Sequence, residues 1–218
     1  MICVCKHAPL TTICTTALDP LLVERIIRAL LKGLEDYTVD ERGDVGSWAR
    51  LSCIKGLGQI VLLFLAEGSV EINKWLPSDT YHEIVAGILK QGVERLNNHR
   101  VEAGKQLIAL LGAPHKPGRE AWTLDTEGLF RDLFVNTQYV AFTGLGYGLS
   151  YQRRSRDDEL DGWQEPAWLY PRAVQLLSIE RYRISVLRGL VLSIGSRNES
   201  TVSRRSSLSY THTLMPRA

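Results

Sequence analysis

The stretch DPLLVERIIRALLKGLEDYTVDERGDVGSWARLSCIKGL, from Asp19 to Leu57, holds two apolar helical patterns separated by a polar turn. Asp19 followed by Pro20 is a typical helix start, because the carboxylate can accept a free backbone N–H and proline suits the first helical position. Apolar residues then recur every three or four positions in two adjacent rows: Leu22, Ile26, Leu30 and Leu34, and Val23, Ile27 and Leu31. This spacing predicts an amphipathic helix.

The second half of the stretch predicts a buried helix. Asp44 can accept the free N–H groups at the start of a helix that runs to about Ala66. Arg50 and Lys55 are the only charged residues in that helix, and a helix that is apolar almost all round needs neighbours on more than one face. We expect Arg50 to pair with an acidic turn of a neighbouring helix pair.

The rest of the chain continues the helical pattern without convincing strand alternation. Further helices are expected at about 80–97, 100–111, 126–141, 170–179 and 182–194, with breaks at the Gly, Pro and Asn clusters between them. The sequence therefore predicts an all-α fold of antiparallel helix pairs. We expect a poorly ordered segment at 1–18, a helical domain at 19–195 with an irregular loop at about 143–166, and a flexible polar tail at 196–218.

Three of the expected helices share a pattern of arginine, small residues three and six positions later, and then leucine. The three arginines are Arg50, Arg100 and Arg183, separated by 50 and 83 residues. One interval of 50 and about two of 42 fit helical repeats of 40–47 residues. The pattern resembles the inner helix of a HEAT repeat, and it predicts a HEAT/armadillo-like α-solenoid whose intermediate repeat is degenerate.

Composition excludes several classes of function. The 218 residues are 44% hydrophobic with a net charge of +2. A nucleic-acid-binding protein would show a concentrated basic face, and this sequence predicts none. The most apolar window, Ile60 to Ala66, is too short to span a bilayer, so no membrane segment is expected. Four cysteines, three of them within the first fourteen residues, form no disulfide framework and favour a reducing compartment.

No motif predicts bond chemistry. The histidines lack metal spacing, and the spacing of Cys3, Cys5, His7 and Cys14 matches no common zinc pattern. The glycine-rich run Gly144 to Gly148 imitates a nucleotide loop but lacks the G-x-G-x-x-G spacing. We therefore expect that the protein is not an enzyme and holds no cofactor or metal. The alternative is an enzyme that uses the glycine-rich run, and nucleotide binding by the purified chain would favour it.

Two long segments carry a family resemblance. ALLKGLEDYTVDERGDVGSWARLSCIKGL (Ala29–Leu57) and WLYPRAVQLLSIERYRISVLRGLVLSIGSRNEST (Trp168–Thr201) resemble tubulin-folding cofactor D, in the order found in that family. The resemblance covers about Pro20 to Thr201 and implies a HEAT/armadillo-type chaperone. It also implies binding of β-tubulin and the αβ-tubulin heterodimer. The family works with tubulin cofactors C and E and a small Arf-like GTPase, and stimulates GTP hydrolysis by tubulin. It implies a cytoplasmic, microtubule-associated protein.

Turns at one edge of a solenoid often carry function, so the charged turn is the candidate partner-binding site. Its residues are Asp36, Tyr37, Asp40, Glu41, Arg42, Asp44 and Trp48. A second candidate is the long loop from Arg153 to Trp163, for which a solvated linker is the simpler interpretation. The tripeptide Arg42-Gly43-Asp44 is expected to form a turn and helix cap, rather than an adhesion signal. A generic helical scaffold with an unrelated client is the alternative function.

The resemblance also has a consequence for stability. Members of the family are several times longer, so the chain is expected to be a fragment or truncated form. Each solenoid repeat buries its apolar face against a neighbour. We therefore expect one of the two apolar rows of the first helix to be exposed and the isolated chain to be prone to aggregation.

Overall fold

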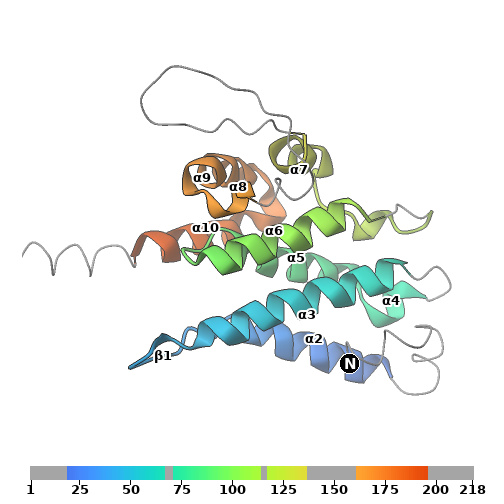
Figure 1. Cartoon of the computed structure of the whole chain (residues 1–218). Helices are drawn as coiled ribbons and strands as arrows, with labels where there is room; N and C mark the ends of the chain where they lie inside the picture. Colours follow the sequence, from blue (N-terminus) through green and yellow to red (C-terminus); the bar gives the residue numbers. More distant parts are fainter. Residues whose placement is uncertain (1–18, 67–70, 114–116, 137–160, 196–218) are drawn as a thin grey trace, which may run out of the picture.

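The computed structural model describes residues 19–66, 71–113, 117–136 and 161–195, and this part of the chain is almost entirely helical. Its helices pack in successive layers, from α2 at the bottom of Figure 1 through α3, then α5 and α6, to α7, α8 and α9 at the top. The predicted all-α, solenoid-like fold of packed helix pairs is confirmed. The segments 1–18 and 196–218, expected to be poorly ordered, lie outside the described residues.

The first helix begins where its sequence predicts. Helix α2 spans Pro20–Gly33, and the Leu22 amide donates a hydrogen bond to the Asp19 carboxylate at 2.7 Å. Val23 and Ile27 are buried against the fold, whereas 38% of Leu22 is exposed. The expectation that one apolar row is left uncovered is thus met in part, because Leu22 is exposed while Ile26 and Leu30 are half-buried.

Helix α3, Gly46–Ala66, is the central helix of the lower layers. It packs against α2 on one side and against α6 and α5 on the other. By length and composition α3 could cross a membrane, yet 56% of its most apolar window is buried inside the fold. The predicted core helix with neighbours on several faces is confirmed.

The middle of the chain differs from the predicted boundaries. After the short helix α4, Ile72–Trp75, helix α5 spans Ser78–Gly92 and α6 spans Asn97–Leu111. The expected helix at 80–97 therefore ends five residues early, and the next begins three residues early. The intervening residues 93–96 form a tight loop, which turns the Glu94 side chain toward α3 and its carbonyl toward α6.

The last third of the described residues builds the upper layer and adds α10 beside α5. It contains a 3-10 turn at Glu120–Trp122 (η2), α7 (Glu127–Phe134), α8 (Asp161–Gln164), α9 (Pro166–Gln175), a 3-10 turn at Leu176–Ser178 (η4) and α10 (Glu180–Gly195). Helix α7 ends at Phe134, short of the expected boundary near 141. Helix α8 lies within the range 143–166 that was expected to be irregular, and most of that range is outside the described residues.

Three small elements of the lower layers were not predicted. One is helix α4, and the other two are the strands β1 (Val39–Asp40) and β2 (Gly43–Asp44), which pair antiparallel. Each is too short to leave a periodic apolar pattern in the sequence. The strands form a hairpin at the tip of the charged turn.

The third copy of the repeat pattern does not occupy the position of the first two. Helices α3 and α6 pack against each other, but α10 packs against α5 rather than α6. Arg50 and Arg100 are fully buried, whereas Arg183 is exposed and donates to the Leu177 carbonyl. The predicted equivalence of Arg183 with the other two arginines is therefore wrong.

The small residues of the pattern do allow close helix packing. Gly189 of α10 lies against the last turn of α5, where an added Cβ would collide with the Lys90 carbonyl and the Val93 side chain. The Ser193 hydroxyl, one turn further on, donates to the Val93 carbonyl at 2.6 Å. Glycine at this position thus fixes the distance between α5 and α10.

Candidate functional site

The charged turn ends in the hairpin of β1 and β2. Asp40 accepts hydrogen bonds from the Arg42 amide at 2.8 Å and from the Arg42 guanidinium at 2.6 Å. Gly43 has a φ of 103°, a conformation that other residues adopt with strain. The tripeptide at 42–44 is therefore a structural turn, as predicted.

Asp44 connects the hairpin to α3. Its carboxylate accepts the Ser47 amide at 3.0 Å in the first turn of the helix, which confirms the predicted cap. The same carboxylate forms two parallel hydrogen bonds with the Arg50 guanidinium, at 3.0 and 2.7 Å. The bond from Arg50 lowers the pKa of Asp44, so this carboxylate is ionised at neutral pH.

Arg50 is the buried centre of the turn, with 1% of the residue exposed. Besides Asp44 it binds the Asp36 carbonyl at 2.6 Å and the Glu94 carboxylate at 3.3 Å. Glu94 follows α5, so the predicted pairing of Arg50 with the turn of a neighbouring helix pair is confirmed. Burial lowers the pKa of Arg50, but the hydrogen bond to Asp44 and the charge of Glu94 raise it overall.

Tyr37 covers this ionic cluster from the solvent side. Its ring lies 4.3 Å from the Arg50 guanidinium, and its hydroxyl donates to Glu94 at 2.5 Å. Burial, followed by the hydrogen bond to Glu94, raises the pKa of Tyr37. The phenol stays neutral and acts as a donor, so Arg50, Glu94 and Tyr37 hold the charged turn against α5.

The exposed part of the site lies beside this cluster. Trp48 projects from the first turns of α3 with 70% of its surface exposed. It borders a groove of about 440 Å³ between the start of α3 and the loop that joins α5 to α6. The groove is lined by Ser47, Trp48, Leu51, Arg95, Leu96, Asn97, Asn98 and His99. Indole, two leucines and a polar rim are the composition of a protein-contact surface.

Five of the eight residues that line this groove lie on a side that the sequence did not predict. Arg95, Leu96 and His99 come from the α5–α6 loop and the start of α6, which the sequence pattern placed inside or just after a continuous helix. His99 Nε2 lies 3.0 Å from the Ser47 carbonyl and joins α6 to α3. Burial lowers the pKa of His99, which keeps the imidazole neutral at neutral pH.

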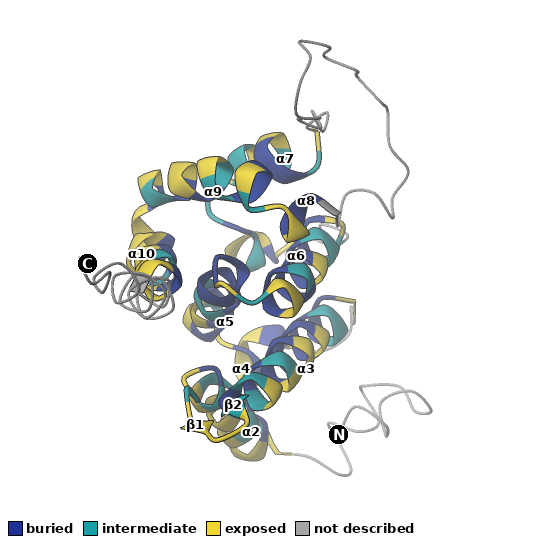
Figure 2. Ribbon diagram, turned by 60° about the vertical axis from the view of Figure 1, so that its left-hand side comes forward, coloured by how far each residue is buried: buried dark blue, intermediate teal, exposed yellow. Residues whose placement is uncertain are grey.

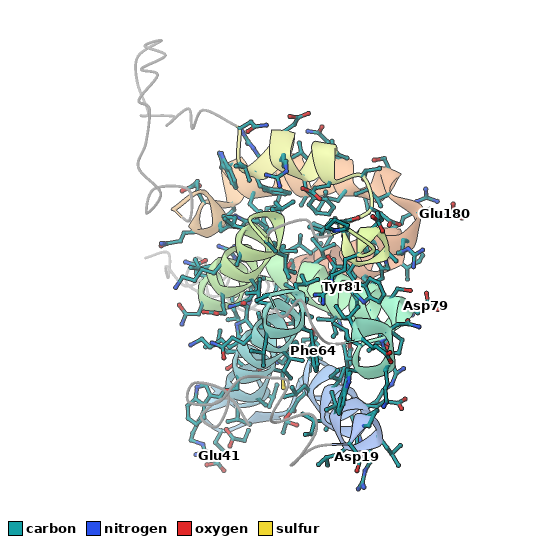
Figure 3. The ribbon with its side chains drawn as sticks, turned by 90° about the vertical axis from the view of Figure 1, so that its right-hand side faces the viewer. Asp19, Glu41, Phe64, Asp79, Tyr81 and Glu180 are labelled. Atoms are coloured by element: carbon teal, nitrogen blue, oxygen red, sulfur yellow. The ribbon has the colours of Figure 1, made fainter. Side chains whose placement is uncertain are left out.

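The seven predicted site residues fall into two groups. Asp40, Glu41, Arg42 and Trp48 are exposed, and Figure 3 shows Glu41 at the outer margin of the molecule, far from the buried Phe64 and Tyr81. Asp36, Tyr37 and Asp44 are half-buried and engaged in contacts within the chain. The first group is available to a partner, and the second group holds it in place.

The other candidates from the sequence either lie in the core or fall outside the described residues. Trp163, the end of the second candidate loop, is buried in α8 and stacks on Phe134 with the ring centroids 4.8 Å apart. It is a core residue rather than a partner contact, and residues 153–160 of the loop lie outside the described residues. So do the glycine-rich run at 144–148 and the cysteines considered as metal ligands. Within the described ranges, no cluster of His, Cys, Asp or Glu could hold a metal ion.

Comparison with known protein families shows the family to which the chain belongs. Residues 82–215 match the family model described as tubulin folding cofactor D C terminal, and this region is more than half of the chain. The chain belongs to this family. The match confirms the resemblance found in the sequence and supports a role in tubulin folding, with tubulin-related partners. No solved structure matches the chain.

The region that matches the cofactor D family model contains one side of the groove but not the other. The α5–α6 loop, with Arg95 and Leu96, lies inside the matched region, whereas Trp48 and the charged turn precede it. The two sides are held together by buried ion pairing between Arg50 and Glu94. The groove is therefore formed jointly by the matched region and the segment before it.

Proposed function

We propose that this chain is the segment of a tubulin-folding cofactor that contacts β-tubulin and helps to assemble and dismantle the αβ-tubulin heterodimer. In this proposal it acts together with tubulin cofactors C and E and a small Arf-like GTPase, and the assembly stimulates GTP hydrolysis by tubulin. It acts by binding and performs no bond chemistry itself. Its place would be the cytoplasm, in association with microtubules.

The family match is the observation that carries this proposal. It favours a tubulin client over the unrelated client of a generic helical scaffold. The exposed charged turn and the Trp48 groove supply a surface suited to contact with a protein. We propose this surface as the client contact.

The physical case rests on how protein interfaces distribute their energy. A few residues carry most of the binding energy, and tryptophan and arginine are enriched among them. Trp48 is exposed without a covering partner among the described residues, while Arg95 stands at the rim of the same groove. The ionic cluster around Arg50 fixes the turn in advance, which reduces the conformational entropy lost on binding.

A matched set of variants tests this surface. The affinity of the full chain for αβ-tubulin is measured by biolayer interferometry for Trp48→Ala and for Leu21→Ala. Leu21 is a control because it is a large apolar residue on α2 that is 65% exposed. We expect Trp48→Ala to weaken binding by 2 kcal/mol or more, about thirtyfold, as for a central aromatic contact. Leu21→Ala is expected to change it by less than about 0.5 kcal/mol.

A second pair of variants tests the charged tip. Glu41→Lys is compared with Glu24→Lys on α2, since both side chains are exposed. A contact at the turn predicts that Glu41→Lys alters the association rate and its salt dependence, while Glu24→Lys leaves both unchanged. If the two variants of each pair had equal effects on tubulin binding, the charged turn and the groove would not be the surface that contacts tubulin.

A further inference from the structure

Helix α10 carries an apolar stripe that no described residue covers. Ile184, Leu187, Val191 and Ile194 follow one another at intervals of three and four residues, so they lie on one face of the helix. Their exposed fractions are 55%, 45%, 58% and 68%. Exposed apolar residues are ordinary when they are scattered, but a continuous stripe on one helix indicates a contact surface.

The opposite face of α10 explains why this helix is fixed in place. Tyr182, Val186 and Ser193 are buried there, and Gly189 packs closely on α5. Figure 2 shows α10 at the margin of the molecule, with α5 on its inner side. The apolar stripe is thus presented outward on a helix that cannot rotate to hide it.

Charge indicates what would cover the stripe. The exposed Arg188 and Arg183 flank it on its two sides, and Glu180 at the very start is the only acidic residue of α10. Arg181 is already paired with Asp125 at 2.9 Å. Arg188, by contrast, has no carboxylate partner among the described residues. The surface is therefore apolar in the middle and basic at its edges.

The three longest segments outside the described residues, 1–18, 137–160 and 196–218, carry no net negative charge. The residues that follow α10, 196–218, contain four arginines and one glutamate, and residues 1–18 contain no acidic residue. The acidic run Asp157–Glu159 is directly preceded by three arginines in four residues. A second copy of α10 would bring its own arginines to a helix whose single acidic residue, Glu180, lies at its very start.

We propose that the outer face of α10 docks an amphipathic helix from outside this sequence, with an apolar stripe flanked by Asp and Glu side chains. Two helices pack when rows of side chains at intervals of three and four residues interlock, and the α10 stripe supplies such a row from Ile184 to Ile194. Carboxylates on the incoming helix would pair with Arg188 and Arg183. This inference does not depend on the Trp48 groove.

The proposal is tested with the full chain and two synthetic peptides of about 20 residues. Both carry leucine at every third or fourth position, and the flanking positions are glutamate in one and lysine in the other. Fluorescence anisotropy measures the affinity of each. We expect the glutamate peptide to bind at least about tenfold more tightly than the lysine peptide. Arg188→Glu should remove or reverse that preference, and Val191→Asp should abolish binding of the glutamate peptide.

Controls on α2 separate this face from general stickiness. Arg25→Glu and Leu21→Asp change equally exposed residues elsewhere and should leave both affinities unchanged. Thermal melting followed by circular dichroism shows whether each variant is folded. If Val191→Asp is not folded, the effect of Arg188→Glu on peptide preference alone tests the proposal. Failure of the wild type to bind the glutamate peptide, or equal affinity for both peptides, would overturn the proposal. So would dimerisation of the chain, or binding to phosphatidylserine vesicles, that Arg188→Glu eliminates.

Discussion

Arg50 and Glu94 are 44 residues apart in the sequence, yet Arg50 Nη2 lies 3.3 Å from Glu94 Oε2 in the interior of the protein. This contact joins the turn before α3 to the loop after α5. It is closed on its outer side by Tyr37, whose hydroxyl donates to the same glutamate. This buried ionic cluster therefore holds the exposed residues of the candidate site in place.

Removal of Arg50 is predicted to be costly. Arg50→Met leaves the Glu94 carboxylate buried without its cation, and breaking a buried ion pair typically costs about 3–5 kcal/mol. We expect urea denaturation to show a loss of about 3 kcal/mol in the free energy of unfolding. The control is Arg42→Met, because the Arg42 side chain is 73% exposed and its ion pair with Asp40 is worth less than about 1 kcal/mol.

The coupling between the two residues is also predicted. In the double variant Arg50→Met, Glu94→Gln no unpaired charge remains at Glu94, so the loss should be smaller than the sum of the two single losses. Additive losses would mean that the two side chains stabilise the fold independently.

Arg100 and Arg183 are predicted to differ sharply in importance. Arg100 donates to the carbonyls of Trp163 at 3.0 Å and Gln164 at 2.8 Å, and so attaches α8 to α6. Arg100→Met would leave the buried Trp163 carbonyl without this donor, at a cost of about 1–3 kcal/mol. Arg183→Met is expected to cost less than about 1 kcal/mol, because this side chain is exposed. Equal losses in thermal denaturation would instead favour the sequence-based equivalence of the two arginines.

Two glycine-to-alanine variants are predicted to change stability in opposite directions. At Gly189 the new Cβ would collide with the Lys90 carbonyl, which belongs to the backbone and cannot rotate away. We expect a loss of about 1–3 kcal/mol as α10 is forced from α5. At Gly128 in α7 an added Cβ meets nothing within 4 Å, so alanine should stabilise the helix by up to about 1 kcal/mol. A stabilised Gly189→Ala would contradict the close packing of α10 on α5.

The fold is predicted to lose stability in mild acid. Burial lowers the pKa of both His82 and His99. As the pH falls below their unfolded pKa of about 6.5, the unfolded chain binds protons more readily than the folded chain, and the free energy of unfolding decreases. The loss should begin near pH 7 and continue downward until the folded-state pKa values are passed. Urea denaturation at pH 7.5, 6.5 and 5.5 measures it, and His82→Gln and His99→Gln should each reduce the slope. An unchanged slope in both variants would assign the effect to other groups.

The sequence predicted those parts of the fold whose causes are local. Asp19 and Asp44 were identified as helix caps because capping depends on residues within one turn. Glu94 was missed, because residues 93–96 continue an apolar helical pattern in the sequence, whereas the structure ends α5 at Gly92 and places Glu94 beside Arg50. Trp163 was placed in an exposed loop, since nothing near it in the sequence reveals its stacking on Phe134. Five of the eight residues that line the candidate groove come from the α5–α6 loop and the start of α6, which only the tertiary structure brings to Trp48.

The proposed function depends most directly on contact with tubulin. Size-exclusion chromatography of the purified chain mixed with αβ-tubulin, at low and at moderate salt, tests it. We predict that the chain co-elutes with tubulin at both salt concentrations, because an apolar contact at Trp48 is little affected by ionic screening. Separate elution of a well-folded chain at low salt would contradict a tubulin contact within these residues.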